Sequence, residues 1–292
     1  MTRQIAICPD TNALLGEGII WDERRQSLFW VDIKNARLFE TDPHEMHSRE
    51  WIIEGDVGGT IGCIAVDYQS DGFLAATGQG FVRLQCENDS RTAKVDLLID
   101  PEAHLPSNRF NDGALDPFGG FWAGSMDDEE REVAGSWWRL NGAGVAQLVD
   151  GFKVTNGPAF LREDKGQCFV FLTDSAASTV YKAAYSEEEG LGPLSKWAQF
   201  DEAMGYPDGM CMDNSGRLWV AFWDGGAIRA YDPTSPKVCG PIETVHLPVR
   251  RPTKMAFTPD GDCFVTSASI GLGETGVDGA IVKICGLSHS TN

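Results

Sequence analysis

Short apolar or aromatic runs separated by polar turns make up most of this chain, and none of them extends into a sustained period of 3.6 residues. Runs such as 28–31 and 218–223 are rich in aromatic and β-branched residues, which favour strands. The chain also contains 33 glycines, many of them at the turns between such runs. The pattern therefore predicts an all-β protein.

One pattern recurs six times: a run with an apolar anchor, then a polar turn, then a second run rich in aromatic residues. The copies span residues 18–32, 63–77, 112–125, 157–174, 209–223 and 254–268. The anchors are 45 to 52 residues apart and are Trp21, Val66, Leu115, Phe160, Met212 and Phe257. A period of ~40–50 residues with several strands per copy is typical of propeller blades. We therefore predict a six-bladed β-propeller with four antiparallel strands per blade.

The copies fill the chain with almost nothing left over, so we expect residues 1–292 to form a single propeller domain. A β-sandwich or a pair of β domains is the alternative, and six regular copies disfavour it. We expect the first strand, near Gln4–Cys8, to lie beside the last blade and close the ring.

Each copy has a second equivalent position, four residues before the anchor, at the start of the innermost strand. These positions are Glu17, Gly62, Asn111, Asn156, Asp208 and Thr253. In a propeller, equivalent inner positions converge on the central channel. Four of the six carry a carboxylate or an amide oxygen, so we expect a polar site at one end of this channel.

Two carboxylates held close together and partly desolvated repel each other unless a cation lies between them. Oxygen ligands suit Ca²⁺, Mg²⁺ and Mn²⁺, and carboxylates also bind Zn²⁺ or Fe²⁺. The pattern thus predicts one divalent metal ion in the channel and leaves its identity open. The alternative is a water-filled polar channel that holds no metal.

Two charged features flank these positions. Arg109 lies two residues before Asn111, where it either holds a substrate oxygen or pairs with a neighbouring acid such as Asp112. The acidic run 127–130 is expected to be a solvated loop, with a lid over the channel mouth as the alternative.

The net charge argues against some classes of binding partner. Lys and Arg total 24 against 43 Asp and Glu, which gives a formal net charge of −19. This balance argues against a partner that is a nucleic acid or an anionic membrane, because either would need a basic face. Eight scattered cysteines without a C-x-x-C pair favour reduced thiols. With no apolar run of about 20 residues and no signal-peptide pattern, we expect a cytoplasmic protein.

The residues at these positions resemble those of the regucalcin (senescence marker protein 30)/gluconolactonase family of sugar-lactone hydrolases. The matching motifs are G-E-G, R-F-N-D-G, T-N-G and P-D-G-M, and they come in the family's order. They lie in the segments 14–33, 108–126, 154–160 and 206–226. The family is one of six-bladed propellers with a divalent metal in the channel, and such propellers are often monomers.

The resemblance assigns roles to individual residues. It implies that Glu17, Asn156 and Asp208 bind the metal and that Asp208 is also the general base. It implies that Arg109 and Asn111 contact the substrate. Glu129 falls where the family has a further substrate-contacting acid after a Gly-Thr-Met stretch, which here is 124–126, Gly-Ser-Met.

The expected activity is therefore metal-dependent hydrolysis of a sugar lactone to an aldonic acid, with the metal as Lewis acid on the carbonyl oxygen. One alternative keeps the metal propeller but gives it another ester, such as an organophosphate. A second alternative is a non-enzymatic propeller that binds calcium or other proteins. Sequence motifs for an acyl-enzyme serine or a phosphate-binding loop are absent.

Overall fold

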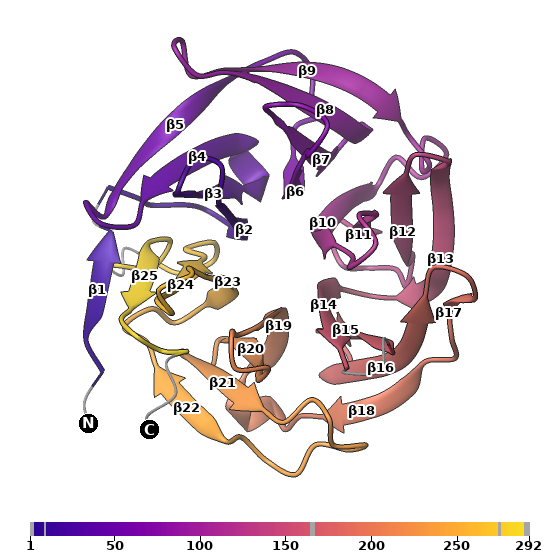
Figure 1. Cartoon of the computed structure of the whole chain (residues 1–292), viewed down its shortest axis with the longest axis vertical. Coiled ribbons are helices and arrows are strands. Elements are labelled where there is room, and N and C mark those ends of the chain that lie inside the picture. The colour runs from indigo at the N-terminus through magenta and orange to yellow at the C-terminus, as the bar shows by residue number, and fades with distance from the viewer. Residues whose placement is uncertain (1–2, 9, 164–166, 274–275, 289–292) are drawn as a thin grey trace.

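The computed structural model describes residues 3–8, 10–163, 167–273 and 276–288. Its β-sheets stand side by side in a ring around a central axis (Figure 1). Helix in the described residues is limited to two 3₁₀ turns, η1 (Ile33–Asn35) and η2 (Glu202–Met204). No helix of this part of the chain has the length and apolar character that crossing a membrane requires. The prediction of an all-β, propeller-like protein is confirmed.

Four of the sheets correspond to one repeat each, and in each of them the first repeat strand lies nearest the axis (Figure 1). One sheet contains β10 (Asn108–Leu115), β11 (Phe121–Asp127), β12 (Gly135–Asn141) and β13 (Gly144–Phe152). The next contains β14 (Thr155–Arg162), β15 (Cys168–Asp174), β16 (Thr179–Ser186), β17 (Gly190–Leu191) and β18 (Ser195–Gln199). A third contains β19 (Tyr206–Met212), β20 (Leu218–Trp223), β21 (Ala227–Tyr231) and β22 (Glu243–His246). The last contains β23 (Pro252–Phe257), β24 (Cys263–Ser267), β25 (Ile281–Ile284) and β1 (Ile5–Cys8).

The first two repeats share one sheet of eight strands. Its first half is β2 (Gly16–Asp22), β3 (Ser27–Asp32), β4 (Arg37–Asp42) and β5 (His47–Glu54). Its second half is β6 (Ile61–Val66), β7 (Phe73–Thr77), β8 (Gly80–Glu87) and β9 (Thr92–Ile99). The outer strands β5 and β9 pair in parallel over three residues each and merge the halves. The described residues therefore form five hydrogen-bonded sheets, where the repeat count predicted six separate ones.

The ring closes through β1, as the sequence predicted. β1 pairs antiparallel with β25, with Ile5 opposite Ile284 and Cys8 opposite Ile281. The outermost strand of the last sheet thus comes from the beginning of the chain, and β2 of the first repeat follows directly from it.

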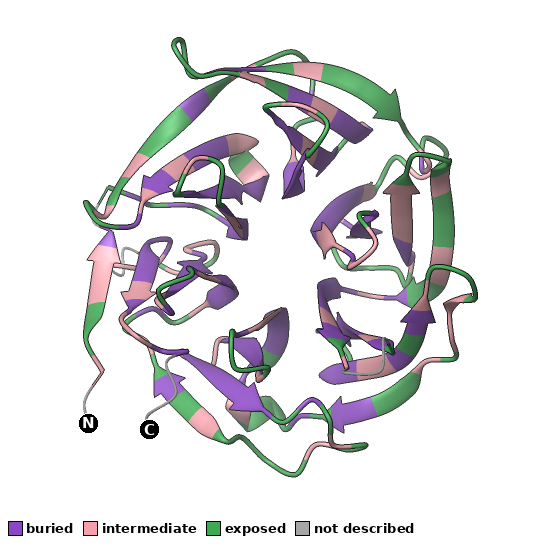
Figure 2. Ribbon diagram, viewed as in Figure 1, coloured by how far each residue is buried: buried purple, intermediate pink, exposed green. Residues whose placement is uncertain are grey.

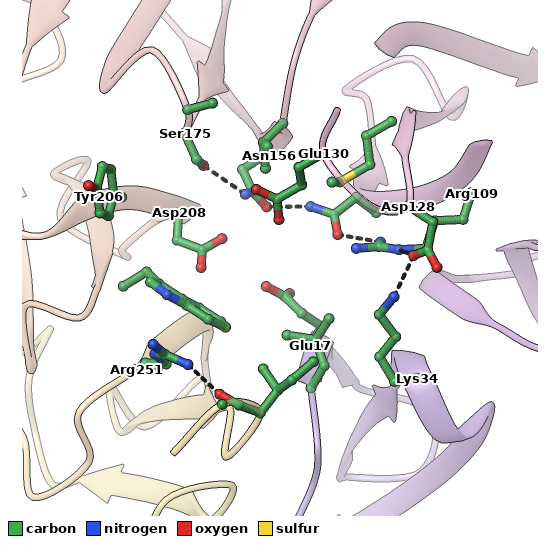
Figure 3. A pocket seen from close by; sticks show the side chains of 18 residues that line it. Glu17, Lys34, Arg109, Asp128, Glu130, Asn156, Ser175, Tyr206, Asp208 and Arg251 are labelled. Carbon is green, nitrogen blue, oxygen red and sulfur yellow. Dashed lines mark hydrogen bonds and ion pairs between the residues drawn. The ribbon is translucent and has the colours of Figure 1, made fainter. Parts of the chain in front are cut away.

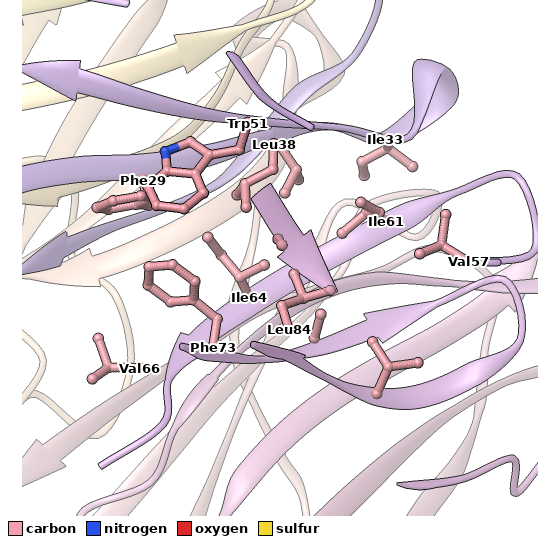
Figure 4. Close-up of a cluster of buried hydrophobic side chains, with 14 of the residues drawn as sticks. Phe29, Ile33, Leu38, Trp51, Val57, Ile61, Ile64, Val66, Phe73 and Leu84 are labelled. Carbon is pink, nitrogen blue, oxygen red and sulfur yellow. The ribbon is translucent and has the colours of Figure 1, made fainter. Parts of the chain in front are cut away.

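The apolar core lies between neighbouring repeats. Most buried apolar side chains of the described residues fall into six clusters, and each cluster draws mainly on two adjacent repeats. Figure 4 shows the cluster in which Phe29 and Leu38 of the first repeat meet Ile64 and Phe73 of the second. Burial on both faces explains why inner strands such as β3 read as continuous apolar runs. Exposed residues gather on the outer strands of the ring (Figure 2).

Every innermost strand has an irregularity in its pairing at the same place. The register shifts fall between residues 17 and 20, 61 and 63, 110 and 113, 156 and 159, 207 and 210, and 252 and 255. A β-bulge bends its strand and redirects the side chains beside it. The residues four positions before the anchors therefore lie in or next to a bulge, where strict alternation of side chains no longer holds.

Trp30 provides a test of the packing between the last and the first repeats. Its ring is fully buried, stacks on Phe39 with centroids 4.3 Å apart, and donates a hydrogen bond of 2.9 Å to Thr41 Oγ1. We expect Trp30→Ala to lower the free energy of unfolding by about 3–5 kcal/mol, measured by denaturant titration. The matched control is Tyr68→Ala, at a site 70% exposed, with an expected change within about 0.5 kcal/mol. Equal losses in the two variants would contradict this account of the core.

Candidate functional site

A cavity of about 570 Å³ lies where the innermost strands converge (Figure 3). Four of the six predicted inner positions line it, each from a different strand: Glu17 (β2), Asn111 (β10), Asn156 (β14) and Asp208 (β19). The other two predicted positions do not. Gly62 has no side chain, and the Thr253 hydroxyl donates to the Gly16 carbonyl at 2.5 Å.

Glu17 and Asp208 are two buried carboxylates that face the middle of this cavity (Figure 3). They are only 3% and 5% exposed. Burial, followed by the charge of Asp112, raises the pKa of Glu17 to about 8. Burial, followed by the charge of Glu17, raises the pKa of Asp208 well above its ordinary value. A cation beside them would favour the ionised form of both carboxylates.

A chain of hydrogen bonds joins the two asparagines of the cavity wall (Figure 3). Arg109 Nη1 donates to Asn111 Oδ1 at 2.6 Å, and Asn111 Nδ2 donates to Asn156 Oδ1 at 3.1 Å. Asn156 Nδ2 then donates to Ser175 Oγ at 2.9 Å, and Ser175 donates to the Pro207 carbonyl at 2.6 Å. These partners fix which end of each amide is oxygen. An amide oxygen has two lone pairs, so Asn156 Oδ1 keeps one for a further ligand.

Arg109 is buried in the cavity wall and pairs with Asp128, while its neighbour Asp112 pairs with another residue. Asp128 also accepts a hydrogen bond of 2.5 Å from Lys34 Nζ. Although burial raises the pKa of Asp128, its contacts with Lys34 and Arg109 outweigh this effect and hold the pKa below its ordinary value. Part of the acidic run 127–130 thus belongs to the wall of the cavity and is not merely a solvated loop.

Glu129 is the one predicted site residue that the structure places outside the cavity lining. Its exposed side chain pairs with Arg131 at 3.2 Å. The cause is a turn after β11, in which the Glu130 amide donates to the Asp127 carbonyl at 2.9 Å and Glu130 takes a φ of 54°. This turn directs Glu129 outward, and Glu130 lines the cavity in its place (Figure 3).

A second ring of lining residues lies on or just before the inner strands, and the sequence analysis had named only Arg109 among them. They lie two positions before the first ring, because residues i and i+2 of a strand share a face. Of the six positions 15, 60, 109, 154, 206 and 251, five line the cavity: Leu15, Arg109, Val154, Tyr206 and Arg251. The same count along each repeat would have found them. Trp223 also lines the cavity, and the Arg251 guanidinium lies 4.7 Å from the centroid of its ring.

The polar groups at the centre of the cavity fit a hard divalent cation. Two buried carboxylates and the free lone pair of an amide oxygen are ligands of the type that Ca²⁺ or Mg²⁺ prefers. In the described residues, no three His, Cys, Asp or Glu side chains gather into a metal-binding group. A cation here would therefore rely on Asn156 as well as on Glu17 and Asp208.

Residues 15–269 match the SMP-30/Gluconolactonase/LRE-like family. A pentonolactonase of Haloferax volcanii is 32% identical over 264 residues, which cover 89% of this chain and 83% of the relative. Regucalcin of Xenopus laevis is 32% identical over 287 residues, which cover 94% of this chain and 91% of the relative. The solved structure of the calcium-binding protein regucalcin from Agrobacterium tumefaciens superposes with a TM-score of 0.83 at 23% identity, over 97% of this chain and 94% of that one.

The family match spans most of the chain and includes the innermost strands of every repeat, with the four polar residues that they direct at the cavity. This protein belongs to the SMP-30/gluconolactonase/LRE-like family.

Proposed function

We propose that this protein is a metal-dependent sugar lactonase that hydrolyses an aldonolactone to the aldonic acid. The observation that carries the proposal is the pair of buried carboxylates, Glu17 and Asp208, on the wall of a cavity of about 570 Å³. The pair needs a cation, and the cavity has room for a small ring beside it. A pentonolactonase among the relatives supports this class of substrate.

Glu17, Asn156 and Asp208 are the proposed ligands of one divalent cation. Their oxygen atoms suit Ca²⁺, Mg²⁺ and Mn²⁺, and also Zn²⁺ or Fe²⁺. The name of the structural relative from Agrobacterium, a calcium-binding protein, favours Ca²⁺ as the first ion to try. When bound, such a cation supplies a Lewis acid for the lactone carbonyl.

Asp208 is the proposed general base. Its carboxylate accepts a proton from the water that attacks the lactone carbonyl carbon, which contributes about 10²–10⁴ in rate. The bond between this carbon and the ring oxygen then breaks, and the ring oxygen takes up the proton from Asp208. Water is consumed, and the product carries one new carboxyl and one new hydroxyl group.

Arg109 and Asn111 are the proposed contacts for the oxygen atoms of the sugar. Asp128, which also pairs with Lys34, holds the Arg109 side chain in the wall, so its position is set before substrate arrives. Such positioning lowers the entropy lost in reaching the transition state. We propose Glu130, in place of Glu129, as the acid that accepts hydrogen bonds from sugar hydroxyls, because Glu130 lines the cavity.

We also propose that the eight-stranded sheet counts as two blades, so that residues 1–292 form one domain of six blades. The six apolar clusters, each between neighbouring repeats, support this count. The parallel pairing of β5 with β9 involves only outer strands and leaves the innermost strands β2 and β6 separate.

The first test is acid release from a panel of aldonolactones, with spontaneous hydrolysis subtracted. Chelator-treated protein should be inactive and should recover on addition of one of the five divalent ions. Asp208→Asn should lower kcat by about 10²–10⁴, because the proton acceptor is lost. It should also weaken metal binding, measured by calorimetry, because a neutral amide replaces a charged ligand.

The matched control is Asp89→Asn, which removes a carboxylate from an exposed turn and should leave both quantities unchanged. Full turnover by Asp208→Asn would exclude Asp208 as the base. Metal binding without acceleration of any lactone, or a far higher rate on an organophosphate ester, would exclude the proposed activity.

Glu17 should give the metal-free protein a characteristic pH dependence. The unfolded chain releases this proton near the ordinary value of 4.5, and the folded protein keeps it until a pKa of about 8. Between these values the folded state binds more protons, so the free energy of unfolding falls as pH rises. We expect the melting temperature of metal-free protein to fall from pH 5 to pH 8, and less steeply in Glu17→Gln.

The control is Glu188→Gln, on an exposed turn. Its melting temperature should fall with pH as steeply as that of the original protein. Excess divalent cation should raise the melting temperature more at pH 8 than at pH 5, because protons and the cation compete for Glu17. The same slope in Glu17→Gln and the original protein would show that Glu17 is ionised in the folded, metal-free state.

The acids 129 and 130 form a matched pair of variants. Glu130→Gln should raise KM about three- to ten-fold, because a charged hydrogen-bond acceptor is lost from the cavity wall. Glu129→Gln removes a charge of the same sign one residue away, on a side chain that pairs with Arg131, and should leave KM within two-fold. Steady-state kinetics on the best lactone measures both. The reverse order would restore Glu129 as the substrate contact.

A further inference from the structure

A buried ion pair crosses the channel behind the cavity. Lys254 (β23) extends its ammonium group to Asp112 Oδ1 (β10), and it also donates to the Gly113 carbonyl at 2.9 Å. Asp112 accepts two backbone amides as well, from Gly113 at 2.7 Å and from Gly157 at 3.0 Å. Both side chains are almost completely buried. All the polar contacts of this pair are thus made inside the protein.

The pair lies next to the two carboxylates of the cavity without lining the cavity itself. The charge of Asp112 raises the pKa values of Glu17 and Asp208, and the charge of Lys254 lowers them. Lys254 also packs against the residue after Asp208, since a Cβ placed on Gly209 would lie 2.9 Å from Lys254 Cβ. The proposed reaction uses neither Lys254 nor Asp112, so their place beside the site calls for a separate account.

The buried groups in this part of the channel carry unequal charge. Glu17, Asp112 and Asp208 are three carboxylates, and Lys254 is the ammonium group among them. Arg109, whose charge also acts on Glu17, is paired with Asp128 in the wall of the cavity. With every group ionised, the cluster therefore has a charge of −2, which equals the charge that one divalent cation neutralises.

We propose that Lys254 is a positioning residue that sets the charge of the buried cluster to −2 and thereby selects a divalent cation over a trivalent one. The inference rests on the cation site of the proposed function. With its three carboxylates ionised, the cluster without the ammonium group would have a charge of −3, and an ion of higher charge would gain more from it. Coulomb energy scales with the product of the charges and is weakly screened in a buried site.

The experiment compares Tb³⁺ with Ca²⁺, because both ions take oxygen ligands and Tb³⁺ luminescence is sensitised by an indole such as that of Trp223 in the cavity wall. Direct Tb³⁺ titration and competition with Ca²⁺ give the ratio of the two dissociation constants. Lys254→Met removes the ammonium group and keeps most of the length of the side chain. We expect this variant to shift the ratio roughly ten- to a hundred-fold in favour of Tb³⁺.

Two further variants separate charge from packing. Asp112→Asn brings the cluster to −1 and should shift the ratio in the opposite direction, toward Ca²⁺. The double variant Lys254→Met/Asp112→Asn restores −2 and should bring the ratio back to within about three-fold of the original, because the two charge changes cancel. Circular dichroism and melting curves identify which variants fold. If Lys254→Met does not fold, the single Asp112→Asn and the double variant still carry the test.

The outcomes are distinct. Shifts of opposite sign in the two single variants, with recovery in the double variant, would support the inference. A similar loss of affinity for both ions in both single variants would mean that the pair acts through packing alone, and would overturn it. If the original protein binds neither ion, the proposed cation site fails together with the inference. If it binds Ca²⁺ and the ratios do not move, only the inference fails.

Discussion

Crowding at the axis of the ring is the constraint on which the site depends. Each innermost strand is covered on both faces by the neighbouring repeats, and its free direction is toward the channel. The bulge in such a strand redirects a side chain, and the direction that packing leaves open is toward the axis. Four polar side chains from β2, β10, β14 and β19 therefore meet although they are far apart in the sequence. The apolar packing between repeats holds them there.

Crowding at the axis also explains why the pKa values of the two carboxylates in the cavity are raised. Glu17 and Asp208 are held too deep for water to solvate their charges well, and the charge of Glu17 adds to burial in raising the pKa of Asp208. Two kinds of positive charge relieve this repulsion. One is built into the chain as Lys254, and the other is the exchangeable cation that we propose. In the wall of the cavity, Asp128 forms ion pairs with both Lys34 and Arg109.

The repeat register explains how much of the site could be predicted. Positions such as Glu17 and Asn156 follow from counting back from the anchors, because equivalent residues of a repeat occupy equivalent places. Glu130 could not be found in this way, because a turn outside the repeat decides which acid faces inward. The Lys254–Asp112 pair was missed for a different reason. Both residues lie in bulges, where the alternation that sequence reasoning uses breaks down.

The fold, like the site, could be predicted from the sequence only in part. The count of repeats and the closure by residues 5–8 follow from local patterns of apolar residues. The parallel pairing of Ile52–Glu54 with Thr92–Lys94 does not, because it joins the outermost strands of different repeats. The periodicity of the inner strands carries no information on which outer edges meet.

The closure by β1 also has a consequence for the order of folding during synthesis. Residues 5–8 emerge from the ribosome long before their hydrogen-bonding partners, residues 281–284. The two half-sheets and three sheets between them can pack one upon another as they appear, since each repeat packs mainly against its neighbours. Their innermost strands are not fixed around a common axis until the ends of this long loop meet. We therefore expect the nascent chain to bury its apolar clusters one after another and to complete the cavity only when β1 and β25 pair.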